Sequence, residues 1–459
     1  MVNETPRVKK FTGQTHQNIK KQSIPAIVTT LFMMFNNLVD SGWVAGLGTH
    51  PLAALGYITP LLLILIGIGN GMGIGINGII ARCIGINDKK TAENAGLHGM
   101  FVGLILSIIL PIILILIFKP LIFILGGGDV YNYASQYAYL VFVFSFTYIF
   151  MGIGAGILRG AGEGKKSLRA METTFILNMI FDPIFIYIFN LGLEGAAIAT
   201  VLSQAIGITI VYTWICLDHD TRYLHIHLKE FKYNHELCKT ILNVGVPASL
   251  DKIIVQITGL IAVMFIAISS GISTVAAFTV SWRILNIFLV PDLGIATAAL
   301  TVGGVAYSSK NFDDFKETYN YSIKLSMLIS VILAIILYVF APQMGIFFTD
   351  FSVTSQLLTP LVRFLHVGCL LLLAYPFCYV TISMFRGVGE GLYSLYLDFF
   401  RNIILTITFM IICVFVLNLG DIGVWWGMII GTFLGSIVNF MVFKKYLTNF
   451  FNKLKVTSI

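Results

Sequence analysis

The sequence predicts an all-α polytopic membrane protein with twelve transmembrane helices in two six-helix bundles related by an internal repeat. First, 57% of the 459 residues are apolar and 11% are charged, whereas soluble proteins carry about 25% charged residues. Second, nearly uncharged stretches of the roughly 20 apolar residues that a helix needs to cross a membrane occur twelve times. Third, short motifs recur at a nearly constant separation. The sequence lacks the alternating segments of a membrane β-barrel, so its backbone polar groups have to be satisfied within helices.

The twelve apolar stretches form two sets of six, separated by the longest polar stretch in the interior of the chain. The first six are residues 22–45, 53–80, 96–118, 134–157, 168–189 and 195–217. The second six are residues 240–268, 275–302, 320–341, 359–383, 394–418 and 423–443. We expect the chain to cross the membrane once in each.

Motifs of the first set recur in the second. Residues 158–164 (LRGAGEG) match residues 385–391 (FRGVGEG), 227 positions later, and Asn-Leu-Gly at 190–192 recurs at 418–420. Duplicated helix bundles are common in polytopic membrane proteins, and an even number of crossings between equivalent positions gives both bundles the same orientation. The predicted division is an N-terminal tail 1–21, an N-lobe 22–217, a linker 218–239, a C-lobe 240–443 and a C-terminal tail 444–459.

The distribution of Lys and Arg indicates the orientation, because these residues concentrate in cytoplasmic loops. With the N-terminus inside, 24 of the 29 Lys and Arg residues fall on the cytoplasmic side, and only Lys119 falls outside. We therefore expect a multi-pass protein of the plasma membrane with both termini and the linker in the cytoplasm. The net charge of +7 follows from this asymmetry. No basic stripe interleaved with stacking aromatics indicates a nucleic-acid partner.

Four polar residues of the N-lobe are candidates for an ion site, because a charge inside a bilayer costs about 2.5–3.5 kcal/mol on insertion scales. Asp40, Asn178, Asp182 and Thr200 lie on three predicted helices, each on the order of 10 Å below the outer surface. Asn178 and Asp182 are four residues apart and share a helix face. Their oxygens suit a small hard cation such as Na+. Alternatively, two carboxylates in a low dielectric cannot easily both ionise, and one of them would carry a proton.

Three further residues accompany these four. Asn37 lies on the same predicted helix as Asp40 and is expected to support the site, and Pro25 in that helix is the expected hinge. Pro183 cannot donate a hydrogen bond to the carbonyl of Met179, which leaves that oxygen free near Asp182. We expect no metal beyond a coupling ion at this site.

The repeat aligns each of the four candidate residues with a position in the second lobe. All four aligned positions are apolar: Ala262, Leu405, Phe409 and Met428. A residue set with a purely structural role would more plausibly be kept or lost in both lobes. We therefore expect an ion site in the N-lobe alone, with a structural hydrogen-bond cluster as the alternative.

The order and spacing of several motifs resemble the multidrug and toxic compound extrusion (MATE) family along almost the whole chain. Residues 37–40 (NLVD), 46–48 (GLG) and 52–56 (LAALG) are similar to the first-helix signature of that family. Residues 159–162 (RGAG), 177–183 (LNMIFDP) and 195–200 (GAAIAT) are similar to its fourth-to-sixth-helix pattern.

This resemblance implies two six-helix bundles in a V shape, and export of organic, often cationic and aromatic compounds against inward flow of Na+ or H+. In the damage-inducible branch of the family, the positions matching the four candidate residues hold the coupling ion, and no cofactor is implied. Another branch carries acidic residues in helices 7 and 10, where this chain has Val255 and Tyr375. We expect drug-like small molecules and the lipid bilayer as partners, and a functional monomer; the sequence does not indicate the substrate-binding residues.

Other functions are less favoured by the residues. A flippase for lipid-linked precursors has a similar two-lobe fold, but the predicted spans hold too few unpaired basic residues for a lipid portal. An enzyme is not expected, because no catalytic triad, metal-protease or phosphate-loop constellation is evident. Residues 73–78 (GIGING) fit GxGxxG but lie in a predicted helix, where glycines favour close packing. Asp251 with Lys252, and Asp398 with Arg401, are expected to form local ion pairs.

The predicted orientation can be tested by cysteine labelling. A cysteine placed at Asn234, in the predicted linker, should react with an impermeant thiol reagent only after the cells are opened, because the basic residues place the linker inside. Labelling of this cysteine in intact cells, in a variant that lacks the native cysteines, would show that the orientation is wrong.

Overall fold

The computed structural model describes residues 13–124, 128–216, 224, 226–227, 231–350 and 358–457, and all regular structure within them is helical. The first half of the chain holds α2 (Thr15–Ala45), α3 (Thr49–Gly85), α4 (Lys89–Ile124), η1 (Gly128–Val130), α5 (Tyr131–Val143), α6 (Phe146–Gly160), α7 (Gly164–Pro183), η2 (Ile184–Ile188) and α8 (Gly192–Cys216). The second half holds α9 (His235–Ser270), α10 (Ile272–Phe288), α11 (Val290–Ser308), α12 (Phe312–Asp350), α13 (Leu358–Val388), α14 (Gly391–Phe399), η5 (Phe400–Thr406), α15 (Ile407–Ile411), η6 (Ile412–Val416) and α16 (Gly420–Thr457). Parts of both predicted tails and of the predicted linker lie outside the described residues.

The helices confirm an all-helical, multi-pass membrane architecture. Within the described ranges, ten helices are long and apolar enough to cross a membrane. An eleventh span is formed if α5 and α6 are counted together, although the chain bends by 46° between them. Each of the twelve predicted stretches coincides with one helix or with consecutive helices. α2 covers the first stretch with 31 residues but is not among these eleven, so the count of twelve crossings stays a prediction.

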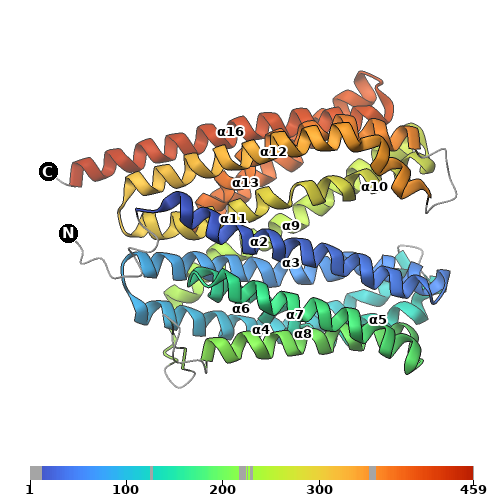
Figure 1. Ribbon diagram of the computed structural model, residues 1–459, viewed down its shortest axis with the longest axis horizontal. Coiled ribbons are helices and arrows are strands. Elements are labelled where there is room, and N and C mark those ends of the chain that lie inside the picture. The colour runs from blue at the N-terminus through green and yellow to red at the C-terminus, as the bar shows by residue number, and fades with distance from the viewer. Residues whose placement is uncertain are drawn as a thin grey trace.

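Four helices occupy the middle of the molecule and connect the two halves of the chain. Figure 1 shows α4–α8 on one side, α12, α13 and α16 on the other, and α2, α3, α9 and α11 between them. α3 packs against both α6 and α9, and α2 packs against both α7 and α11. The beginning of α2 and the end of α16 lie at the same end of the molecule (Figure 1).

Glycines on two faces of α3 bring its backbone close to two other helices. A Cβ atom added at Gly73 would lie 2.2 Å from the carbonyl oxygen of Gly152 on α6, and one added at Gly75 would lie 2.7 Å from the carbonyl oxygen of Ile241 on α9. Small residues allow such backbone approach in membranes. The GxGxxG segment 73–78 lies inside α3, which confirms that it packs helices and forms no phosphate-binding loop.

Polar contacts join the two halves at the end of the molecule where α2 begins. Thr15 Oγ1 donates a hydrogen bond to Asp314 Oδ1 of α12 at 3.0 Å. Arg82 Nη1, near the end of α3, donates to the carbonyl oxygen of Gly387 on α13 at 2.9 Å. The halves are therefore held against each other at this end.

Left-handed backbone positions recur along the chain in pairs. Eleven described residues have φ between +52° and +110°, and all but Gly13 form pairs that are 223 to 228 positions apart: Gly48 and Gly271, Asn87 and Lys310, Gly162 and Gly389, Asn190 and Asn418, and Gly192 and Gly420. The π-helical turns η2 and η6 follow the same rule, since Ile184 and Ile412 are 228 positions apart. The left-handed positions lie in the connections between helices or at helix ends, at similar separations in the two halves of the chain.

The close approach of α3 and α6 gives a stability prediction. Gly156→Ala should lower the unfolding temperature in detergent, because the added Cβ would lie 2.3 Å from the carbonyl oxygen of Gly73, and overpacking costs about 1–3 kcal/mol. Gly259→Ala in α9 is the matched control, since its Cβ would meet nothing within 4 Å. Equal unfolding temperatures for the two variants would contradict the close packing.

Candidate ion-binding site

Two carboxyl groups from different helices meet inside the first half of the chain. Asp40 lies on α2 five residues before its end, and Asp182 lies near the end of α7. The two helices pack against each other, and the carboxyl groups are close enough to interact directly. The structure thus brings together the two acidic residues that the sequence singled out, as the paired carboxylates.

Each carboxylate accepts a hydrogen bond from an asparagine one helical turn earlier. Asn178 Nδ2 donates to Asp182 Oδ1 at 3.2 Å, and Asn36 Nδ2 donates to Asp40 Oδ2 at 2.9 Å. Sequence reasoning found Asn178 by its spacing of four residues. The same spacing relates Asn36 to Asp40, but its neighbour Asn37 was expected to support the site instead. The side chain of Asn37 is not among those the structure describes.

Three side-chain oxygens of the paired carboxylates and Asn178 are buried but accept no hydrogen bond. They are Oδ1 of Asp40, Oδ1 of Asn178 and Oδ2 of Asp182. The side chains of Asn178 and Asp182 are 2% and 1% exposed. A buried polar atom without a partner costs about 1–3 kcal/mol, so three such acceptors on two adjacent helices form a place that can take up a proton or a cation.

Thr200 lies on α8, which packs against α7 and α5. Its side chain is buried, and its hydroxyl donates to the carbonyl oxygen of Ala196 at 2.9 Å. Tyr137 of α5, 4% exposed, interacts with Thr200 and with both carboxylates. No spacing along the sequence pointed to Tyr137, because α5 lies far from α2 and α7 in the chain.

The two prolines lie at opposite ends of this arrangement. Pro25 is buried in α2, 15 residues from Asp40. Pro183 is the last residue of α7, and the chain continues as the π-helical turn η2. Beyond it, Tyr187 Oη donates to the carbonyl oxygen of Trp43 at 2.6 Å, which ties the end of α7 and η2 to the end of α2.

In the part of the chain that the structure describes, no basic side chain neutralises the paired carboxylates. The described groups that act on them are the carboxylates themselves, Asn36, Asn178 and the neutral hydroxyl of Tyr137. Two like charges in a low-dielectric site are unfavourable together. Two carboxylates and an amide oxygen can hold either a shared proton or a small hard cation. Among the described residues, no group of three or more His, Cys, Asp or Glu side chains forms a metal site.

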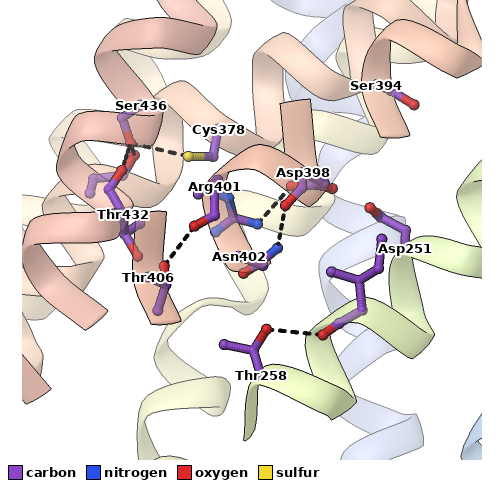
Figure 2. A network of polar contacts seen from close by, with 12 residues as sticks. Asp251, Thr258, Cys378, Ser394, Asp398, Arg401, Asn402, Thr406, Thr432 and Ser436 are labelled. Atoms are coloured by element: carbon purple, nitrogen blue, oxygen red, sulfur yellow. Dashed lines mark hydrogen bonds and ion pairs between the residues drawn. The ribbon is translucent and has the colours of Figure 1, made fainter. Parts of the chain in front are cut away.

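A second buried charge cluster, in the other half of the chain, holds equal numbers of acids and bases, although Asp251 Oδ1 and Arg401 Nε have no hydrogen-bond partner. Arg401 Nη2 donates to Asp398 Oδ1 at 2.7 Å (Figure 2), which confirms that expected pair. The expected pair of Asp251 and Lys252 is wrong, because Asp251 Oδ2 accepts from Arg386 Nη2 of α13 at 2.5 Å. Arg386 also lies 3.9 Å from Asp398. Two acids and two bases balance one another here, so this cluster does not require an ion.

The chain matches known proteins over nearly its whole length. The family model described as MatE matches residues 25–184 and, a second time, residues 247–412. Multidrug export protein MepA of Staphylococcus aureus is 23% identical over 425 residues, which cover 92% of this chain and 91% of that protein. MepA of Staphylococcus haemolyticus is 25% identical over 413 residues, 89% of this chain and 88% of that protein.

Solved structures give the same picture. A structure described as the outward-facing conformation of a multidrug resistance MATE family transporter has a TM-score of 0.93 and 34% identity, covering 97% of this chain and 99% of that one. A MOP superfamily transporter from Pyrococcus furiosus has the same TM-score, identity and coverage. Its description states that reverse polarity of the binding pocket suggests a different function.

The two charge clusters predict opposite effects of the same substitution. At pH 8, Asp182→Asn should leave the unfolding temperature in detergent unchanged or raise it, because it removes like-charge repulsion and adds a donor for the free Oδ1 of Asp40. Asp398→Asn should lower it, because Arg401 loses its charge partner and breaking a buried pair costs about 3–5 kcal/mol. An equal loss of stability in both variants would mean that the paired carboxylates are a structural cluster.

Proposed function

This chain belongs to the multidrug and toxic compound extrusion (MATE) family of membrane transporters, and from that premise we propose that it exports drug-like organic compounds from the cell. Members of the family are transporters, not enzymes, and need no cofactor. The matched relatives are multidrug export proteins, which supports substrates that are varied and often cationic and aromatic. In the proposed reaction, export is driven by H+ or Na+ moving inward.

The observation that carries this proposal is the set of three buried acceptor oxygens at the paired carboxylates. Oδ1 of Asp40, Oδ1 of Asn178 and Oδ2 of Asp182 have no donor, and a coupling cation supplies what they lack. A proton between the carboxylates would satisfy one oxygen of each. A Na+ ion would take all three as ligands, with the Thr200 hydroxyl as a fourth oxygen.

The proposed mechanism is alternating access by movement of two lobes. The contacts of Thr15 with Asp314 and of Arg82 with Gly387 lie at the end that the basic residues assign to the cytoplasm. They favour a state closed to the inside, and the similarity to an outward-facing transporter agrees with it. A change at Asp40 would be transmitted along α2 to Pro25, where the helix lacks one backbone hydrogen bond.

The two-lobe organisation of this proposal has its own support. The MatE model matches the chain twice, beginning at residues 25 and 247. The left-handed positions pair at separations of 223 to 228 residues. We propose that helices α2–α8 form the N-lobe and α9–α16 the C-lobe of a monomer with twelve crossings and cytoplasmic termini.

Transport in proteoliposomes with separately imposed Na+ and pH gradients tests the function. The wild-type protein should export a cationic aromatic dye under one of the two gradients and not without a gradient. Asp182→Asn should abolish gradient-driven export while dye binding persists, because pockets for organic compounds are lined mainly by apolar and aromatic side chains.

The matched control is Asp129→Asn, whose carboxylate is exposed and should not affect export. Transport of the dye by Asp182→Asn at the wild-type rate under both gradients would refute the coupling role. Translocation of a lipid-linked precursor by the wild-type protein, without dye export, would instead support the flippase alternative.

A further inference from the structure

A third buried carboxylate lies in the second half of the chain, where no role has been assigned to it. Asp292 is in the first turn of α11, just after Leu289, where α10 and α11 are interrupted. The combined length from Ile272 to Ser308 is long enough to cross the membrane, and Asp292 is near its middle. Pro291 leaves the carbonyl of Ile287 without its helical donor, so the backbone is polar at this depth as well.

Among the described side chains, only neutral hydroxyls bind this carboxylate. Ser330 Oγ of α12 lies 2.9 Å from both oxygens of Asp292, and Ser326 Oγ donates to Oδ1. Asp292 and both serines are at most 1% exposed. Two serine hydroxyls on one helix thus clamp an acid that has no counter-ion among the described residues.

The charged side chains on the surrounding helices do not act on Asp292. The groups that act on it are Ser326 and Ser330. The Lys and Arg residues on the helices packed against α11 have other positions or partners. Lys20 and Lys21 of α2, Arg283 of α10, and Lys316 and Lys324 of α12 are exposed. Arg82 of α3 bonds to Gly387, and Arg363 and Arg386 of α13 pair with Asp421 and Asp251, respectively. An uncompensated charge at mid-membrane is costly, so a cation at Asp292 would remove a cost that the protein otherwise bears.

A row of buried hydroxyls leads from this carboxylate to the inner end of α12. Thr318, Ser322, Ser326 and Ser330 follow one another at four-residue spacing, and all are at most 1% exposed, so they share one helix face. Ser322 Oγ has no hydrogen-bond partner. Thr318 Oγ1 donates to the carbonyl oxygen of Asp314 at 2.7 Å, where α12 begins. A water molecule bound to the free hydroxyl of Ser322 would complete the row.

Asp292 also lies beside the helix that carries Asp40. A Cβ atom added at Gly294, two residues along α11, would lie 2.9 Å from the backbone nitrogen of Ile27 and 3.1 Å from the carbonyl oxygen of Ser23. These residues flank Pro25, so α11 touches the backbone of α2 at its proposed hinge. A change at Asp292 can therefore act on the same helix as a change at the paired carboxylates.

We propose that Asp292, clamped by Ser326 and Ser330, is a second proton-binding site, and that the hydroxyl row of α12 connects it to the inner surface. A proton arriving from water bonds to Oδ2, which accepts fewer hydrogen bonds than Oδ1, and converts the carboxylate to a neutral acid. On release this O–H bond breaks and the proton passes to water at the inner end. The role in coupling rests on the proposed function; the binding of a proton does not.

Infrared difference spectroscopy between acid and alkaline pH tests the site directly. The measurement uses the full chain carrying Asp40→Asn and Asp182→Asn, so that the first ion site does not contribute. The carbonyl band of a protonated buried acid should remain in this background and disappear when Asp292→Asn is added. Ser330→Ala, which keeps the acid but removes a donor, should shift the band, and Asp129→Asn should leave it unchanged.

Two results would overturn the proposal. One is a spectrum that Asp292→Asn and Ser330→Ala both leave unchanged in folded protein. The other is loss of the band on adding NaCl at constant pH, compared with choline chloride, which would assign the site to Na+ instead of a proton.

A transport measurement tests the coupling role of Asp292 independently. If Asp292 carries a coupled proton, the steady dye ratio reached by Asp292→Asn should fall about tenfold for each unit of imposed pH difference, since one proton fewer is exchanged. An unchanged ratio, together with loss of the infrared band, would overturn the coupling role while the proton site remains. Absence of gradient-driven export in the wild-type protein would refute the proposed function and leave the infrared result intact.

Discussion

The juxtaposition of Asp40 and Asp182 is the constraint on which the first half of the structure depends. Two unit charges about 4 Å apart repel by roughly 4 kcal/mol at an effective dielectric of 20, and no base among the described residues offsets this. The fold still holds them together, through the packing of α2 on α7 and the hydrogen bond from Tyr187 to Trp43 near the end of α2. A bound cation would turn this repulsion into attraction. Its departure would push α2 and α7 apart, which gives ion occupancy a physical means of moving α2.

Buried charge is handled differently in the two halves of the chain. In the second half, Asp251 pairs with Arg386, and Asp398 pairs with Arg401 (Figure 2), so this region can stay rigid whatever ions are present. The described hydrogen-bond donors to the paired carboxylates and to Asp292 are all neutral. These unbalanced acids lie on α2 and α7, and on α11, which touches α2. The acids able to respond to a cation thus lie on α2 or on helices packed against it. The ion-paired acids lie on other helices, α9 and α14.

The sequence predicted the helices and the meeting of Asp40 with Asp182 well, because apolar stretches and buried acids can be recognised by local rules. Apolar stretches mark helices, and a carboxylate within one stands out by its cost, as Asp40 and Asp182 did. Contacts between distant segments were not predictable in this way. The partner of Asp251 is Arg386, 135 residues along the chain, and the nearer Lys252 was expected instead; Tyr137 likewise reaches the site only through packing of α5. Asp292 met the same criterion as Asp40 but was overlooked, since its serines lie 34 and 38 residues away.

Cation release on drug binding tests the central claim most directly, because cation and drug are held to favour opposite states of one transporter and linkage makes their effects reciprocal. The measurement adds a cationic dye to purified protein in weakly buffered detergent solution, and records released protons with a pH indicator and released Na+ with a selective electrode. The account predicts that the wild-type protein releases one of these cations in proportion to the dye bound, and that Asp40→Asn binds the dye with less release. Equal release by the two proteins, at equal dye binding, would contradict the assignment of the coupling ion to the paired carboxylates.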